Sequence, residues 1–194
     1  MNEQPPPWAD ALLRTVLSAD ARESVSGDLL EEYRDAILPT RGRGAADRWY
    51  VGQVAGYLWR STRWWAFAFS GAFVARTSLD ALVPTTDFST RSFVSTACGV
   101  VLLASGACWV SWRCRSIRAG VIAAVVTSLL AAVFSVLGTS VLLALRHDPA
   151  TMRAIAGSGG LAEAYTLPFM MLVPAVFLGM IGGAAGRVTR MLSS

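Results

Sequence analysis

Three long runs without a charged residue most strongly constrain how this chain can fold. The runs cover residues 92–112, 119–145 and 164–186, and they contain 21, 27 and 23 residues. An α-helix rises about 1.5 Å per residue, so roughly 20 residues cross a hydrocarbon core about 30 Å thick. Soluble core helices can be apolar all round, but three such runs in 194 residues are not typical of them. The pattern predicts an all-α integral membrane protein.

The composition agrees with a membrane protein and excludes several other classes. Hydrophobic residues make up 54% of the chain and charged residues only 15%, so a disordered or collagen-like chain is excluded. Three cysteines are too few for a disulfide scaffold. All 17 basic residues are arginines, and their positions report on membrane topology.

A fourth span is predicted for residues 64–83, although its sequence is less clearly apolar. Its first 12 residues are uncharged, but Arg76 and Asp80 follow. If this segment spans, ten arginines lie on one side of the membrane, in residues 41–63, 113–118 and 187–190. The opposite side then holds three arginines. The positive-inside rule therefore favours four spans, with both termini in the cytoplasm of a bacterium and the spans in its inner membrane.

Residues 1–63 differ from the rest and are expected to form a cytoplasmic helical module ahead of a transmembrane domain at 64–194. Two amphipathic stripes predict helices, and Pro39 is expected to end the second. The stripes consist of Trp8, Leu12 and Val16, and of Val25, Leu29, Tyr33 and Ile37. A third helix is expected from Ala45 toward Arg60, continuing into the first span. Its tryptophans and tyrosines indicate either an interfacial helix on the inner leaflet or packing against the two preceding helices.

Charge is segregated within this amino-terminal module. Residues 1–35 have a net charge of −5, whereas residues 41–63 have a net charge of +4. We expect the acidic helices to dock on the basic helix, on the 113–118 loop, or on a basic protein partner bound through residues 1–60. A nucleic-acid partner is disfavoured because the exposed soluble part is acidic.

A run of seven residues in the second helix carries a resemblance to a known family. The segment reads Gly-Asp-Leu-Leu-Glu-Glu-Tyr, and its matching residues are Gly27, Asp28, Leu29, Glu31, Glu32 and Tyr33. With Trp49, Tyr50 and Gln53 further on, it resembles the bacterial permease prefix domain. That helical module precedes the first membrane helix of some macrolide-exporter-type ABC permeases and of short stand-alone membrane proteins. The resemblance covers roughly residues 8–60 and implies a membrane location, but it does not extend to a transport domain.

Arg76 and Asp80 are the charged residues that the first span has to accommodate. Their i, i+4 spacing places them on one helix face. An unpaired arginine near the membrane centre costs about 2.5–3.5 kcal/mol, so this face is expected to meet protein or water. Two interpretations remain open, an ion pair that locks helix packing and a polar pore or ligand site.

The last span carries four glycines in two overlapping GxxxG pairs. They are Gly179, Gly182, Gly183 and Gly186, and such spacing lets helix backbones approach closely. Packing within the bundle, with Gly71 and Ala75 as a complementary face, is favoured over homo-oligomerisation. Pro174 is expected to kink this span.

No constellation of catalytic, cofactor-binding or metal-binding residues is found. The chain has one histidine, His147, and its three cysteines lack CxxC spacing. Cys114, between two arginines, is expected to be a free thiol or a palmitoylation site. We therefore expect a non-enzymatic inner-membrane protein that binds or regulates a partner. The alternative is a small transporter or an accessory subunit of an ABC-type transporter, built around Arg76, Asp80 and the last span.

Overall fold

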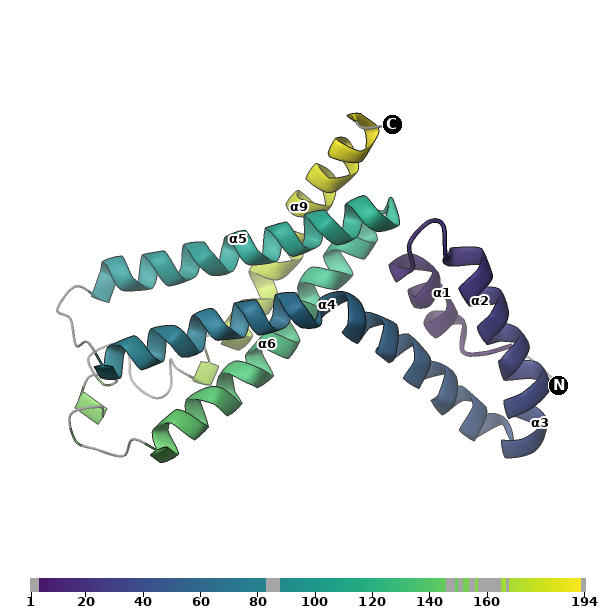
Figure 1. Cartoon of the computed structure of the whole chain (residues 1–194), viewed down its shortest axis with the longest axis horizontal. Helices are drawn as coiled ribbons and strands as arrows, with labels where there is room; N and C mark the ends of the chain where they lie inside the picture. The colour runs from purple at the N-terminus through teal and green to yellow at the C-terminus, as the bar shows by residue number, and fades with distance from the viewer. Residues whose placement is uncertain are drawn as a thin grey trace.

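The computed structural model describes residues 4–82, 88–145, 149, 152–153, 156, 165–166 and 168–192, without the side chains of residues 77, 80–81, 88–89 and 91–92. The described residues are helical apart from short turns and contain no strand (Figure 1). An all-α fold is thereby confirmed for this part of the chain. The elements are α1 (Pro7–Val16), α2 (Arg22–Glu31), the π-helix η1 (Glu32–Ile37), α3 (Leu38–Arg41), α4 (Arg43–Leu82), α5 (Phe88–Cys114), α6 (Ile117–Leu145) and α9 (Leu172–Leu192).

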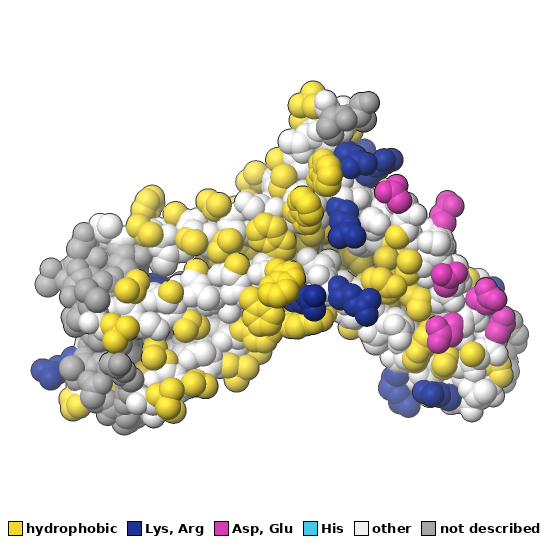
Figure 2. All heavy atoms as spheres, in the orientation of Figure 1, with side chains coloured by type: hydrophobic (Ala, Val, Ile, Leu, Met, Phe, Trp, Pro, Cys, Tyr) yellow, Lys and Arg dark blue, Asp and Glu magenta, His cyan; other side chains and the backbone are white. Residues whose placement is uncertain are grey.

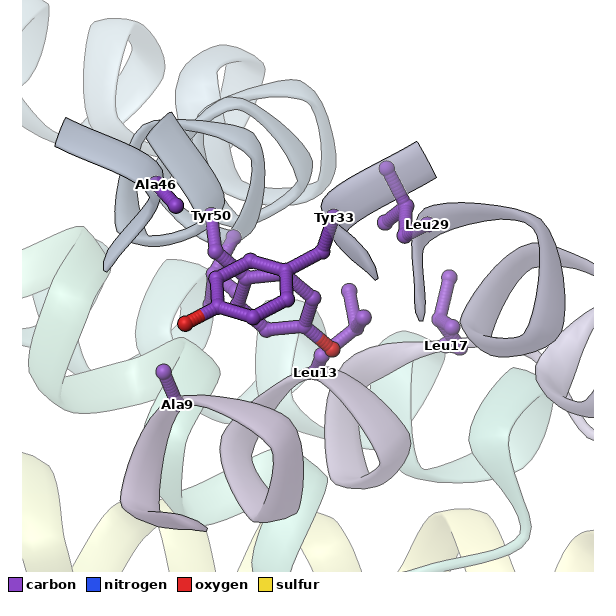
Figure 3. Packing of buried hydrophobic residues seen from close by; sticks show 8 residues of the cluster. Ala9, Leu13, Leu17, Leu29, Tyr33, Ala46 and Tyr50 are labelled. Atoms are coloured by element: carbon purple, nitrogen blue, oxygen red, sulfur yellow. The ribbon is translucent and has the colours of Figure 1, made fainter. Parts of the chain in front are cut away.

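Two tyrosines form the centre of a small core between α1, α2, η1 and the first turns of α4 (Figure 3). The rings of Tyr33 and Tyr50 meet edge to face, with their centroids 5.9 Å apart. The second predicted stripe is confirmed, because Leu29 and Tyr33 are buried and Val25 and Ile37 pack against them. The first predicted stripe is confirmed in part. Val16 is buried and Leu12 packs against the core. Trp8, however, is 60% exposed, and Ala9 and Leu13 complete the buried face of α1.

The second helix continues past Pro39, which corrects the prediction that this proline ends it. The chain passes through a π-helical turn, in which the backbone N–H of Leu38 donates to the carbonyl of Tyr33. Pro39 then lies in the first turn of α3, where its missing N–H costs little. The helix stops at Gly42, whose φ of +71° lies in the left-handed region that glycine adopts without strain.

Helix α4 joins the amino-terminal module to the apolar helices. It is continuous over 40 residues, as expected from the run that begins near Ala45. Figure 1 shows it bending where it leaves the module. Its first half packs on α1, and its second half packs on α5 and α6. A single continuous helix therefore links the module to the apolar helices.

Three described helices are long and apolar enough to cross a membrane. They cover Phe93–Cys114, Ile117–Leu145 and Leu172–Leu192. The first two agree with the predicted spans, whereas the third begins eight residues later than predicted and ends six later. Pro174 lies in the first turn of α9, and a turn at Met171 separates α9 from the helical residues 168–170.

Helix α6 has its small residues inside and its large apolar residues outside. Its buried face consists of Ala119, Gly120, Ala123, Ala124, Thr127, Ser128, Ala131, Ala132, Ser135, Thr139 and Leu143. Its exposed face carries a ladder of large side chains at four-residue spacing, Leu129, Val133, Leu137, Val141 and Leu145. Small residues allow close helix contact, and exposed leucines and valines suit a lipid environment. Figure 2 shows hydrophobic side chains spread over this part of the surface.

Candidate functional site

The amino-terminal module is attached to the end of α5 by a contact between residues 92 positions apart. Arg22 Nη2 donates a hydrogen bond of 3.1 Å to the carbonyl oxygen of Cys114. Cys114 is the last residue of α5, and the carbonyls in the last turn of a helix have no partner within it. A cation there satisfies a carbonyl and interacts favourably with the helix dipole.

A second contact closes the same junction. The thiol of Cys114 donates to the carbonyl oxygen of Val16, at the end of α1, over 3.2 Å. Cys114 is only 2% exposed, so the thiol is covered by the module and palmitoylation at this site is disfavoured. The acidic helices therefore dock on two of the three expected surfaces, the first turns of α4 and the turn of residues 113–118. At the turn, the module contributes the Arg22 guanidinium and the Val16 carbonyl, and not the acidic side chains that the charge distribution suggested.

Inside the module, each buried tyrosine donates to a carboxylate on another helix. The Tyr33 hydroxyl donates to Asp47 Oδ1 at 2.6 Å, and the Tyr50 hydroxyl donates to Asp10 Oδ1 at 3.0 Å. Burial, with the hydrogen bond to Asp47 as the next cause, raises the pKa of Tyr33 from 10.0 to about 12. Burial and the bond to Asp10 also raise the pKa of Tyr50. Both phenols remain neutral donors at physiological pH.

A cavity of about 390 Å³ lies where the module, α4 and the end of α5 meet. Two arginines line it, Arg60 from α4 and Arg113 from α5, and three tryptophans form much of its wall, Trp64, Trp65 and Trp109. Ser18 and Ser61 also line it, and no aspartate or glutamate is among its lining residues. Figure 2 shows arginine side chains gathered in the angle between the module and the apolar helices. The cavity is therefore suited to an anion.

An apolar groove of about 590 Å³ shares part of this wall. Trp65 and Trp109 line both spaces, and the groove continues between α5 and α9 past Trp112 and Ile181. The rings of Trp109 and Trp112 stack with centroids 5.6 Å apart. The Arg190 guanidinium lies 4.9 Å from the Trp112 ring centroid. The junction thus combines a cationic cavity with an apolar groove.

Arg76 and Asp80 both lie on the second half of α4, as predicted. The Arg76 side chain is half-buried. This agrees with the expectation that its face of the helix is not surrounded by lipid alone. The side chain of Asp80 lies outside the described residues, so the predicted i, i+4 pair stays a prediction.

The four glycines of α9 face α5 and α6. A Cβ on Gly182 or Gly186 would collide with the backbone carbonyl of Ala104 or Cys108 on α5. A Cβ on Gly179 would lie 2.8 Å from the Cα of Val121, and one on Gly183 would lie 3.1 Å from the carbonyl oxygen of Ile117. These surfaces are occupied within one chain and are not open to a second copy. The expected complement on α4 is wrong, because Gly71 is exposed, with nothing within 4 Å of a Cβ placed there.

Polar side chains are buried along the same helix contacts. The Ser111 hydroxyl on α5 donates to the Gly183 carbonyl on α9 at 2.6 Å. On α6, the hydroxyls of Ser128 and Ser135 are buried without a hydrogen-bond partner among the described residues. No group of three or more histidine, cysteine or acidic residues in the described parts of the chain is arranged to hold a metal ion.

The residues of the prefix motif divide between core and surface. Leu29 and Tyr33 are buried, whereas Gly27, Asp28, Glu31 and Glu32 are exposed on the outer side of the module. Sequence reasoning did not assign Arg22, Arg60, Arg113 or Trp109 to a site. Arginine and tryptophan at the ends of apolar runs were a usable signal. Nothing in the sequence shows that Arg60 and Arg113 line one cavity or that Arg22 reaches Cys114.

Comparisons of this chain with protein-family models, with curated proteins and with solved structures find no match.

Proposed function

We propose that this chain is a non-enzymatic, multi-pass protein of the bacterial inner membrane that binds or regulates a protein partner. In this proposal residues 64–82 of α4 form a fourth span beside α5, α6 and α9, and both termini are cytoplasmic. The arginine distribution of ten against three supports that orientation. The packing of α4 against α5 and α6 supports the fourth span.

The observation that carries the proposed role is the attachment of the module. Arg22 and Val16 fix its inner side to the end of α5, while its outer side carries exposed carboxylates. They belong to Glu23, Asp28, Glu31, Glu32 and Asp35, and Figure 2 shows acidic side chains gathered on that side. A helical module that is held in place and presents one acidic face is suited to a partner with a basic surface. The resemblance to the permease prefix domain supports the membrane location in this proposal.

Site-specific photo-crosslinking in native membranes tests this proposal. A photoreactive residue at Asp35 is expected to give a crosslinked protein adduct, identified by mass spectrometry. Asp28→Asn with Glu31→Gln and Glu32→Gln is expected to reduce that adduct several-fold. A photoreactive residue at Leu137, on the outer face of α6, is the control and is expected to crosslink to lipid. If the Asp35 adduct persists unchanged after neutralisation, the acidic face is not the partner surface.

The alternative is a small transporter or an accessory subunit of an ABC-type transporter. Half-buried Arg76 and the buried hydroxyls of Ser128 and Ser135 favour it, because polar groups inside membrane helices often line a path for solutes. The test replaces Ser135 by cysteine and treats intact cells with a membrane-impermeant maleimide. Rapid labelling would favour a water-filled path, whereas no labelling would favour a closed helix contact.

A further inference from the structure

We propose that the junction between the module and the apolar helices binds an anionic phospholipid. The phosphate group would occupy the cavity between Arg60 and Arg113, and an acyl chain would occupy the adjoining groove. This inference goes beyond the proposed partner-binding role. It requires a membrane around the apolar helices, but not a protein partner.

The positive charge of the cavity favours an anionic lipid headgroup. Arg60 and Arg113 are exposed, and both line the cavity, whose lining includes no carboxylate. The Arg60 guanidinium lies 5.7 Å from the ring centroid of Tyr57, which holds it at the cavity wall. Guanidinium groups donate to phosphate oxygens in a fork geometry, and the Ser18 side chain lines the same cavity. With no carboxylate in its lining, the cavity favours an anion over a zwitterion.

The groove selects an amphipathic anion over a soluble one. Trp65 and Trp109 line both spaces, so the cavity and the groove lie next to the same two indoles. The groove lining is dominated by apolar side chains, among them Trp112, Ile181 and Ala185. A soluble phosphate would leave this groove empty, whereas the chain of a phospholipid would fill it. Only a molecule with a phosphate and a hydrocarbon chain uses both.

The position along the helices matches the depth at which such a lipid lies. The cavity is at the end of α5, next to the exposed Trp64, and the groove extends into the apolar half of α5 and α9. Tryptophan and arginine are enriched at headgroup depth, and hydrocarbon chains lie deeper. The lipid would therefore belong to the leaflet on the module side.

The test uses the full chain in nanodiscs of phosphatidylcholine with or without phosphatidylglycerol, and counts co-purified lipid by native mass spectrometry. We expect phosphatidylglycerol to be enriched on the wild-type protein. Arg60→Gln with Arg113→Gln should weaken its binding about tenfold. Arg118→Gln with Arg187→Gln is the matched control, because it removes the same charge at exposed positions that line neither space. Arg60→Lys with Arg113→Lys should retain most of the binding and shows that the junction tolerates substitution.

A second pair of variants distinguishes a lipid from free phosphate. Ala185→Trp fills the groove and should weaken phosphatidylglycerol binding, while the neighbouring Ala184→Trp, outside the groove, should not. Inorganic phosphate should compete only weakly. Equal retention of both phospholipids, or equal loss in the Arg60/Arg113 and control variants, would overturn the proposal. Full displacement by inorganic phosphate, with no effect of Ala185→Trp, would assign the cavity to a soluble anion and would overturn it as well.

Discussion

Arg22, at the start of α2, caps the last residue of α5, Cys114, through a hydrogen bond of 3.1 Å to its backbone carbonyl. Because this contact bridges the amino-terminal module and the apolar helices, it controls how firmly the two are joined. Arg22→Ala removes the donor and leaves the carbonyl without this partner. We expect this variant to weaken docking by about 1 kcal/mol, at the low end for a charged hydrogen bond because Arg22 is partly exposed.

Hydrogen–deuterium exchange measures that loss of docking directly. Amides in α1 and α2 should exchange faster in Arg22→Ala, while those in α6 should be unchanged. Arg14→Ala is the control, because Arg14 makes an i, i+4 ion pair with Asp10 on the exposed side of α1. Equal exchange in Arg22→Ala and wild type would show that the capping contact does not hold the module.

The Cys114 thiol offers a chemical measure of the same junction. Since this side chain is covered by the module, alkylation by N-ethylmaleimide should be slow in the wild-type protein in mild detergent. Arg22→Ala should accelerate it several-fold, because the thiol reacts only when the module undocks. The rate is followed by mass spectrometry of the Cys114 peptide. Rapid alkylation of the wild-type thiol would contradict the docked arrangement.

The tyrosine core predicts a pH dependence for the module. The pKa of Tyr33 is raised to about 12, so the folded module holds this proton more tightly than the unfolded chain does. Its contribution to stability is complete below pH 10 and is lost as pH rises from 10 toward 12. In Tyr33→Phe this alkaline loss should be smaller, and the missing hydrogen bond to Asp47 should cost about 1 kcal/mol at neutral pH. Unfolding curves followed by circular dichroism at pH 8 and pH 11 measure both effects, and an unchanged alkaline loss would argue against Tyr33 as its source.

The close contact between α9 and α5 predicts that replacing a glycine by alanine lowers stability on α9 but not at an open position on α4. Gly186→Ala places a methyl group against the backbone carbonyl of Cys108, which has no side-chain freedom to move aside. We expect a loss of about 1–3 kcal/mol, measured by unfolding in mixed detergent micelles. Gly71→Ala is the matched control, because that position on α4 is open. It should be neutral or stabilising by up to about 1 kcal/mol through helix propensity. Equal losses in both variants would refute close packing at Gly186.

The local pattern of charged and apolar residues along the sequence was sufficient to predict several of the helices. The absence of charge over 92–112 and 119–145 predicted two helices closely, because burying or lipid-exposing a charge is costly over a whole span. The repeat of Val25, Leu29, Tyr33 and Ile37 predicted a buried helix face. The prediction of a helix end failed where two local effects compete. Pro39 was expected to end a helix, yet a π-helical turn accommodates it and Gly42 ends the helix instead.

Sequence periodicity and charge placement were enough to establish an all-α chain with membrane-length apolar helices, because both depend on residues close together along the backbone. They did not show that Arg22 meets Cys114, that Arg60 and Arg113 share one cavity, or that the α9 glycines face α5 and α6. Those contacts join residues dozens of positions apart, and they depend on helix angles set by the packing of all the side chains together. The candidate site exists only where these helices meet, so it became visible only in the folded arrangement.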